Sequence, residues 1–328
     1  MYSYILRRLI YMVLSLLLIS VISFVVIQLP PGDFLTSYIA QLSASGAPVQ
    51  EEIIASLRVR YGLDQPVYIQ FFRWILGIVT RGDMGESFLW KMPVKAIISI
   101  RLPLTMAISL ATLIFTYTIS IPIGVYSATH QYSSSDYLFT TIGFLGIAIP
   151  NFLFALVLMY IFHSYLGWSV GGLFSPQYAE APWSFEKFMD FLKHLPIPMI
   201  VIGASGTAGL IRVMRACMLD ELQKPYVITA RAKGLPERIL LYKYPFRIAI
   251  NPILSSLGWL LPSIVSGETI TSIVLGLPTM GPVLFRALIS QDMYLAGSII
   301  LILSSLVLIG TFLSDILLVL ADPRIRYT

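Results

Sequence analysis

The sequence contains little charge and almost no cysteine. Asp, Glu, Lys and Arg make up 12% of the 328 residues, about half the share that is typical of a soluble domain. The single cysteine, Cys217, excludes an internal disulfide framework and a cysteine-rich metal site. The composition therefore argues against an ordinary soluble domain and predicts no metal site within this chain.

Motifs for nucleotide binding and for catalysis are also lacking. No stretch follows the pattern GxxxxGK[ST], so the chain is not expected to bind ATP by itself. The loops that are assigned below to the inner side of a membrane contain no grouping of nucleophile, base and acid. We therefore expect no catalytic residue, no enzymatic activity and no cofactor bound by this chain.

Long apolar runs take the place of charge. Hydrophobic residues make up 57% of the sequence, and a helix needs roughly 20 apolar residues to cross a bilayer core. The sequence predicts an all-α membrane protein with six transmembrane helices. These spans are Leu9–Leu29, Leu104–Ala128, Tyr137–Leu166, Leu195–Ile211, Ile248–Leu275 and Leu295–Leu320.

A polar stretch separates the first two spans and defines the expected organisation. Residues 1–29 hold the first span, residues 30–102 form an outer segment, and residues 103–328 form a five-helix core. Within the outer segment, Val67–Val79 is apolar but only about 13 residues long, and it contains Arg73. It is too short and too polar to cross the bilayer, so it predicts an interfacial helix.

The distribution of basic residues predicts the orientation, because Lys and Arg gather in cytoplasmic loops. With six spans and an inner amino terminus, 12 of the 22 basic residues lie on the inner side, and the short outer loops hold only three. Both termini are therefore expected in the cytoplasm. The inner residues are Arg7, Arg8, Arg212, Arg215, Lys224, Arg231, Lys233, Arg238, Lys243, Arg247, Arg324 and Arg326.

The most basic loop covers residues 219–247, between the fourth and fifth spans. Burying its charged stretch Tyr226–Leu240 in lipid would cost on the order of 10 kcal/mol, so it must lie outside the membrane. Pro225 suits the first turn of a helix, and Gly234 suits the left-handed position beyond its end. Pro236 can start a second helix, with Glu237 in its first turn.

Helical spacing places Tyr226, Thr229, Ala230 and Lys233 on one face of the first of these helices. Ala232 and the glycine that follows keep the end of this helix slim. Such a basic, helical projection fits the groove of a partner protein. The alternative is an ordinary basic loop that orients the protein and binds lipid headgroups, and the residues alone leave both interpretations open.

The stretch Thr229-Ala-Arg-Ala-Lys-Gly-Leu235 resembles the coupling motif, or EAA loop, of ABC importer permeases, in particular those of the dipeptide and oligopeptide class. The glutamate of that motif is absent, and Thr229 stands near its place. Six further strings match patterns of this class in order along nearly the whole chain. They are Leu29–Asp33, Tyr61–Pro66, Gly82–Ser87, the pair Arg247–Leu254 and Glu268–Gly281, and Ala321–Tyr327.

The resemblance implies a type I importer permease fold and a function in transport. Two cytoplasmic ATPase subunits, which bind ATP and Mg, would grip the coupling loop of this chain and its counterpart on a second homologous permease. A substrate-binding protein outside would deliver the cargo. The implied coupling residues are Tyr226, Thr229, Ala230, Arg231, Ala232, Lys233, Gly234, Leu235 and Glu237.

The resemblance also implies a location and a range of cargo. The chain is expected in the plasma (inner) membrane of a bacterium or archaeon, in contact with membrane lipid and not with nucleic acid. Peptides are the leading cargo, with oligosaccharides, nickel or other small solutes as alternatives. A secondary transporter is a remote alternative, because the spans carry almost no charge at mid-depth and no inverted repeat is visible.

Residues of the fifth span are candidates for the translocation path or gate. Glu268 lies in the outer half of this span, and an ionisable group at membrane depth is a functional candidate, although a paired structural acid is the alternative. Elsewhere, Trp74 and three other tryptophans are expected to anchor the outer interface. Gly203, Gly206 and Gly209 predict close packing against another helix. The candidate path residues are Trp259, Ser263, Ser266 and Glu268.

Overall fold

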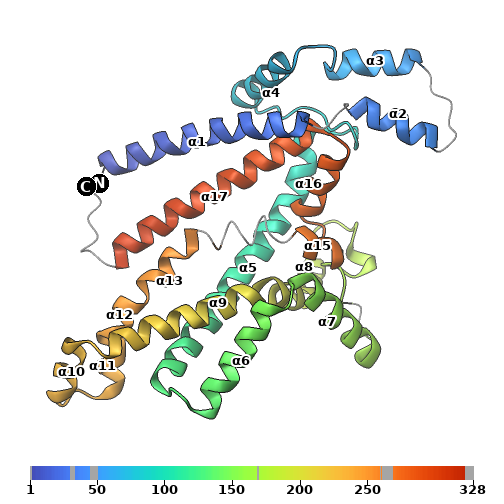
Figure 1. The fold of residues 1–328 in the computed structure, drawn as a ribbon. Coiled ribbons are helices and arrows are strands. Elements are labelled where there is room, and N and C mark those ends of the chain that lie inside the picture. Colours follow the sequence, from blue (N-terminus) through green and yellow to red (C-terminus); the bar gives the residue numbers. More distant parts are fainter. Residues whose placement is uncertain are drawn as a thin grey trace. The chain divides into compact units, whose positions relative to one another are not determined.

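The computed structural model describes residues 2–29, 34–44, 51–167, 170–258, 260 and 269–321. This part of the chain is built of helices, with one isolated antiparallel bridge between Glu86 and Pro93 (Figure 1). The prediction of an all-α protein is confirmed for these residues. The chain divides into two compact units: Met1–Thr105 with Thr279–Leu306, and Met106–Pro278 with Val307–Thr328.

The first unit contains the amino-terminal helices and a carboxy-terminal pair. The short helix α4 covers the apolar stretch that is predicted as an interfacial helix, so its helical nature is confirmed. Its position in a membrane stays a prediction. The helices are α1 (Tyr2–Gln28), α2 (Phe34–Ala44), α3 (Glu51–Tyr61), α4 (Val67–Arg81), the start of α5 (Val94–Thr129), α16 (Met280–Ile289) and the start of α17 (Met293–Ala321).

Trp74 on α4 forms the aromatic centre of this unit. Its side chain is 3% exposed, stacks on Phe24 with ring centroids 5.8 Å apart, and donates from Nε1 to Ser298 Oγ at 3.3 Å. Gly297 lies against the ring, where an added Cβ would come within 3.0 Å of it. The expectation that Trp74 anchors the outer interface is therefore wrong, because the glycine leaves room for the indole inside the unit.

Asp292 directly precedes α17 and holds the loop between α4 and α5 in the first unit. Its buried carboxylate accepts hydrogen bonds from Ser87 Oγ at 2.5 Å and from the amide of Leu89 at 3.2 Å. The same side chain accepts from the amide of Leu295 at 3.2 Å, which caps the helix. The motif Gly82–Ser87 is thus held by Asp292, more than 200 residues later in the sequence.

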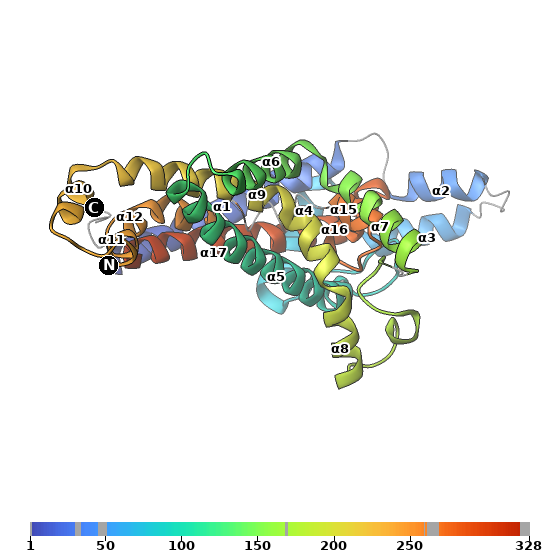
Figure 2. The ribbon, with the colours of Figure 1, turned by 90° about the horizontal axis from the view of Figure 1, so that it is seen from below.

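The second unit contains most of the five-helix core and the basic loop. Figure 2 shows its helices from below. They are the rest of α5 and of α17, α6 (Ser134–Ala148), α7 (Asn151–Leu166), the 3-10 turn η1 (Pro176–Tyr178), α8 (Phe185–His194), α9 (Pro196–Leu222), α10 (Pro225–Ala232), α11 (Glu237–Lys243), α12 (Pro245–Ala249), α13 (Asn251–Ser255) and α15 (Thr269–Val274).

Four helices of the described residues are long and apolar enough to cross a membrane, and a bent pair raises the number to five. The structure therefore supports a multi-pass membrane protein. Part of the predicted span Ile248–Leu275 lies outside the described residues, so the count of six stays a prediction. The four candidate spans are Arg7–Gln28, Val94–Thr129, Pro196–Leu222 and Met293–Leu317.

The predicted span Tyr137–Leu166 is not one straight helix. It is divided into α6 and α7, whose axes differ by 107°. Pro150 lacks an amide hydrogen, and Ile149 before it adopts extended angles of φ −90° and ψ 122°, because a residue before proline avoids the helical region. The proline at residue 150 therefore ends one helix and starts the next.

Small residues allow α6 and α9 to approach closely. A Cβ added to Gly146 would lie 3.4 Å from both the carbonyl oxygen of Ala204 and Cβ of Ala208. A Cβ added to Gly203 would lie 3.2 Å from Phe115 on α5. The predicted close packing is therefore present within this chain at residue 203, whereas a Cβ at Gly209 would meet no atom within 4 Å.

Candidate coupling surface

The candidate site is the hairpin of α10 and α11, which follows the carboxyl end of α9 in both views (Figure 1, Figure 2). Pro225 opens α10, as the sequence predicts, and Lys224 before it adopts extended backbone angles. After α10, Gly234 takes the left-handed conformation with φ +77°. Pro236 then precedes α11, whose first turn holds Glu237. The predicted order of helix, glycine break and helix is confirmed.

The glycine break is a Schellman motif, in which two amides beyond a helix bond back to its last carbonyl groups. The amide of Gly234 donates to the carbonyl of Arg231 at 3.0 Å, and the amide of Leu235 donates to the carbonyl of Ala230 at 3.5 Å. The positive φ that this turn requires is unfavourable for a residue that carries a Cβ. Glycine at residue 234 therefore sets the geometry of the hairpin.

A small apolar cluster holds the two helices of the hairpin together. Val227 and Ala230 on α10 are 0% and 6% exposed, and Leu240 on α11 is 0% exposed. Leu235 and Tyr244 pack against them. The sequence placed Ala230 on a common face with Tyr226, Thr229 and Lys233, but the structure directs Ala230 into this cluster. Ala230 shares a face of α10 with Val227, three residues earlier, and Leu240 of α11 buries this face.

Most of the remaining candidate residues are exposed on the surface of the hairpin. Ile228, which the sequence analysis left out, is 55% exposed beside them. It is one of several large apolar side chains that are exposed on the hairpin, together with Ile239 and Tyr242 of α11. The exposed candidates are Tyr226, Thr229, Arg231, Ala232, Lys233, Gly234 and Glu237, and Leu235 is half-buried.

An exposed ion pair bridges the glycine break. Arg231 Nε lies 2.5 Å from Glu237 Oε1, and its Nη2 lies 3.3 Å from Oε2. The hydrogen bond from Arg231 lowers the pKa of Glu237 below its ordinary value. Both side chains are about half exposed, at 48% and 57%, so solvent screens most of their attraction.

Polar side chains of α10 otherwise bond within their own neighbourhood. Tyr226 Oη donates to the carboxylate of Glu221, the residue before the last of α9. Burial and this negative neighbour raise the pKa of Tyr226. Thr229 Oγ1 donates to the carbonyl of Pro225 at 2.8 Å. The threonine that stands near the place of the motif's acid is thus bonded to its own helix.

Two short helices connect the hairpin to the bundle of the second unit. α11 contacts α12, and both α12 and α13 contact α9. Tyr117 Oη on α5 donates to the carbonyl of Ile253 on α13 at 3.0 Å. Ser314 Oγ on α17 donates to the carbonyl of Leu254 at 3.0 Å. The hairpin is therefore continuous with helices on which three long helices converge.

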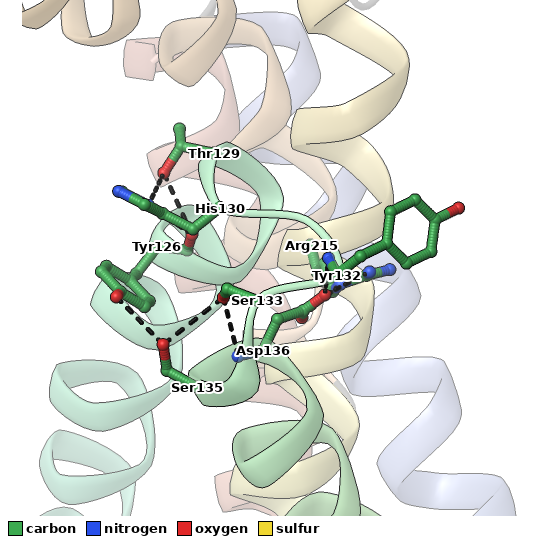
Figure 3. Close-up of polar contacts among 8 residues, drawn as sticks. All are labelled: Tyr126, Thr129, His130, Tyr132, Ser133, Ser135, Asp136 and Arg215. Carbon is green, nitrogen blue, oxygen red and sulfur yellow. Dashed lines mark hydrogen bonds and ion pairs between the residues drawn. The ribbon is translucent and has the colours of Figure 1, made fainter.

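A buried ion pair ties α9 to the first turn of α6. Arg215 Nε lies 2.9 Å from Asp136 Oδ1, and its Nη2 lies 2.8 Å from Oδ2 (Figure 3). The carboxylate also accepts from the amide of Tyr132 at 3.0 Å. The side chain of Asp136 is 4% exposed. The sequence alone does not indicate this pair, because 79 residues separate its members.

The candidate residues of the translocation path fall within residues 259–268. Trp259, Ser263, Ser266 and Glu268 all lie outside the described residues. In the part of the chain that is described, no three His, Cys, Asp or Glu residues are grouped so that they could hold a metal ion. Among the described residues, the candidate site therefore consists of the α10–α11 hairpin and its connection to α9.

Two family descriptions match this chain. Residues 120–327 match the binding-protein-dependent transport system inner membrane component, and residues 1–111 match the N-terminal part of such membrane components. The matched regions include the hairpin of α10 and α11 and nearly all of the remaining sequence. The hairpin thus lies inside a region that is shared with inner-membrane transport components.

Individual relatives are similar over their whole length. The oligopeptide transport system permease protein AppB of Bacillus subtilis is 35% identical over 329 residues, with 100% of each chain covered. A putative peptide permease protein of Brucella ovis is 33% identical, again with 100% of both chains covered. The oligopeptide transport system permease protein OppB of Haemophilus influenzae is 29% identical with the same coverage.

Proposed function

Since this chain belongs to the family of binding-protein-dependent transport system inner membrane components, we propose that it is one of two permease subunits of an ATP-driven peptide importer. The chain is a multi-pass transport subunit of that family and not an enzyme. Its full-length relatives are named for oligopeptides and peptides, which favours a peptide cargo over an oligosaccharide or a metal ion.

The α10–α11 hairpin carries the proposal for ATP coupling. Its backbone is fixed by the Schellman motif and by its own apolar cluster, so a push on its surface moves it as a unit. Its solvent-exposed, basic face contains Ile228 and Arg231. We expect this face to lie in a groove of a cytoplasmic ATPase subunit, with two ATPases and two permeases in the complex.

The connection from the hairpin to the bundle supports the same function. Contacts of α12 and α13 with α9, and hydrogen bonds from α5 and α17 to α13, join the hairpin to three candidate spans. Movement of the hairpin on ATP binding would therefore tilt these helices together. A substrate-binding protein on the opposite side of the membrane would supply the peptide, and both termini would lie in the cytoplasm.

Substitutions at Gly234 test this proposal. A Cβ at this position would meet no atom within 4 Å, so a side chain adds bulk to the exposed surface of the hairpin without an internal clash. Gly234→Asn adds a side chain that tolerates positive φ, whereas Gly234→Val also strains the backbone. We expect both variants to insert and to assemble, with peptide import reduced at least about tenfold per ATP hydrolysed.

Gly167 provides the matched control. It also has a positive φ, of +65°, and open space around its Cβ position, but it ends α7 rather than α10. Reconstituted complexes would be compared for peptide uptake and for ATP hydrolysis. Normal coupling in both Gly234 variants, or an equal loss in Gly167→Val, would contradict the coupling role of the hairpin.

A further inference from the structure

A lateral groove in the second unit is not explained by the coupling hairpin. A cavity of about 410 Å³ lies among α5, α6, α7 and α9, half open to the outside of the chain. Its walls are almost entirely apolar and include Phe115, Ile142 and Ile200. This volume lies within the range of about 300–1,000 Å³ that is usual for sites of small ligands.

A second hollow continues the groove toward the carboxyl end of α9. It has a volume of about 250 Å³ and shares four lining residues with the first cavity, among them Phe139 and Ile211. Two arginines, Arg212 and Arg215, line it. At 1.5 Å per helical residue, Arg212 lies about 12 Å along α9 from Ala204 in the apolar cavity. The groove is therefore apolar at one end and basic at the other.

The two arginines differ in what they already bind. Arg215 directs Nε and Nη2 to Asp136 and keeps further N–H groups for another acceptor (Figure 3). Arg212 is exposed, and no described carboxylate forms an ion pair with it. Since Asp136 balances the charge of Arg215, one positive charge remains at this end of the groove.

We propose that this groove binds one anionic phospholipid, with an acyl chain in the apolar cavity and the headgroup phosphate at Arg212 and Arg215. The charge of a phosphodiester matches the unbalanced arginine, and basic pockets between membrane helices are suited to such headgroups. An acyl chain has no polar group to satisfy in the apolar part. A peptide in the same place would leave its backbone amides without hydrogen-bond partners, which argues against a translocation path here.

The bound lipid would contact the two helices that the buried ion pair joins. α6 and α9 form both walls of the second hollow, and Asp136 and Arg215 connect them at its basic end. The lipid is thus expected to lie beside the connection between α9 and the first turn of α6. This site depends on insertion of the chain in a membrane and not on the identity of the transported cargo.

Retention of lipid after purification tests the site. The complex would be extracted from membranes that contain phosphatidylglycerol and washed with mixed micelles of detergent and phosphatidylcholine. Its remaining lipid would be identified by mass spectrometry. We expect Arg212→Gln to retain about five- to tenfold less phosphatidylglycerol than the unmodified chain, with Arg212→Lys intermediate. Arg247→Gln, which removes an exposed charge outside the groove, is the matched control and should retain the lipid.

Photocrosslinking identifies what occupies the apolar part. A benzoylphenylalanine at Ile142, which lines the cavity, should form an adduct enriched in phosphatidylglycerol. The same group at Leu138, exposed on α6 outside the two hollows, should sample lipids in their bulk proportion. Crosslinking of residue 142 to a second permease chain, or to lipids in bulk proportion, would overturn the proposal.

Two further outcomes keep the result unambiguous. Inorganic phosphate at millimolar concentration should not displace the retained lipid, because it lacks the acyl chain. Displacement would show that the arginines bind phosphate alone and would refute binding of the acyl chain in the apolar cavity. Equal loss of lipid in Arg212→Gln and Arg247→Gln would assign the retention to general surface charge and would also refute it. Neither assay uses transport or ATP hydrolysis, so failure here is separate from failure of the proposed importer function.

Discussion

Two arginine–carboxylate pairs in the second unit have the same chemistry and different surroundings. Asp136 and Arg215 have side chains that are 4% and 26% exposed, and they join the first turn of α6 to α9. Glu237 and Arg231 are 57% and 48% exposed and join two consecutive short helices. The first pair holds together segments distant in sequence, whereas the second lies on a surface that we assign to a partner.

In this chain with few charges, an ion pair can either constrain the fold or remain available to another protein. A buried carboxylate that loses its partner remains desolvated without compensation, so the buried pair strongly constrains the fold. An exposed pair is replaced by water at little cost, and its members remain available to another protein. Burial therefore separates a structural connection from a docking surface more clearly than residue type does.

Asp136→Asn is expected to have the largest effect. It leaves the guanidinium of Arg215 without its carboxylate and should lower the free energy of unfolding by about 3 kcal/mol. Thermal unfolding of the purified protein, followed by tryptophan fluorescence, would measure the change. Glu237→Gln serves as the matched control at the exposed pair. An equal, small effect of both substitutions would remove the distinction between the two pairs.

Leu240→Ala is expected to have an intermediate and local effect. The side chain is fully buried in the cluster with Val227, and its truncation should cost about 2 kcal/mol or more of hairpin stability. Amide hydrogen exchange should accelerate in α10 and α11 and stay unchanged in α6 and in the first turns of α9. Ile239→Ala, at the neighbouring and 51% exposed position, is the control. Equal acceleration in the α6 region would mean that the hairpin has no separate core.

Glu237→Gln is expected to have the smallest effect on stability, about 0.5 kcal/mol or less. Arg231 lowers the pKa of Glu237 from its ordinary value of 4.5. The pair therefore contributes its stabilisation above that pH, and the contribution is lost as the pH falls through the lower pKa of the folded state. Unfolding curves from pH 7 to pH 3 for both proteins should converge at the acidic end, and salt should narrow their difference. Curves that diverge toward acid would contradict this sign.

Much of the hairpin could be predicted from the sequence, because its determinants are local. Pro225, Gly234 and Pro236 restrict their own backbone angles or those of a neighbour, so their order alone predicts helix, break and helix. The insertion cost of Arg231, Lys233 and Glu237 places the same stretch outside the lipid. The inward position of Ala230 was missed, because it depends on where Leu240 of the next helix lies.

Features that join distant segments were not predictable in this way. Nothing near Trp74 in the sequence indicates that Gly297 and Ser298 would enclose its indole. The sequence predicted one span over Tyr137–Leu166. Pro150 accounts for a break within it, but the size of the bend, 107°, depends on how α6 and α7 pack against their neighbours. The groove that ends at Arg212 likewise appears only when α6 and α9 are brought together.

The sequence by itself determined the membrane environment, the helical class, the shape of the coupling hairpin and the resemblance to importer permeases. These follow from the lengths of apolar runs, from the cost of burying charge and from backbone restrictions. Each of these acts within one continuous stretch of the chain. The tertiary structure alone decided which carboxylate Arg215 binds, which tryptophan is buried and where an apolar groove meets a basic end. Such features depend on contacts between residues far apart in the chain, and only the folded backbone brings those residues together.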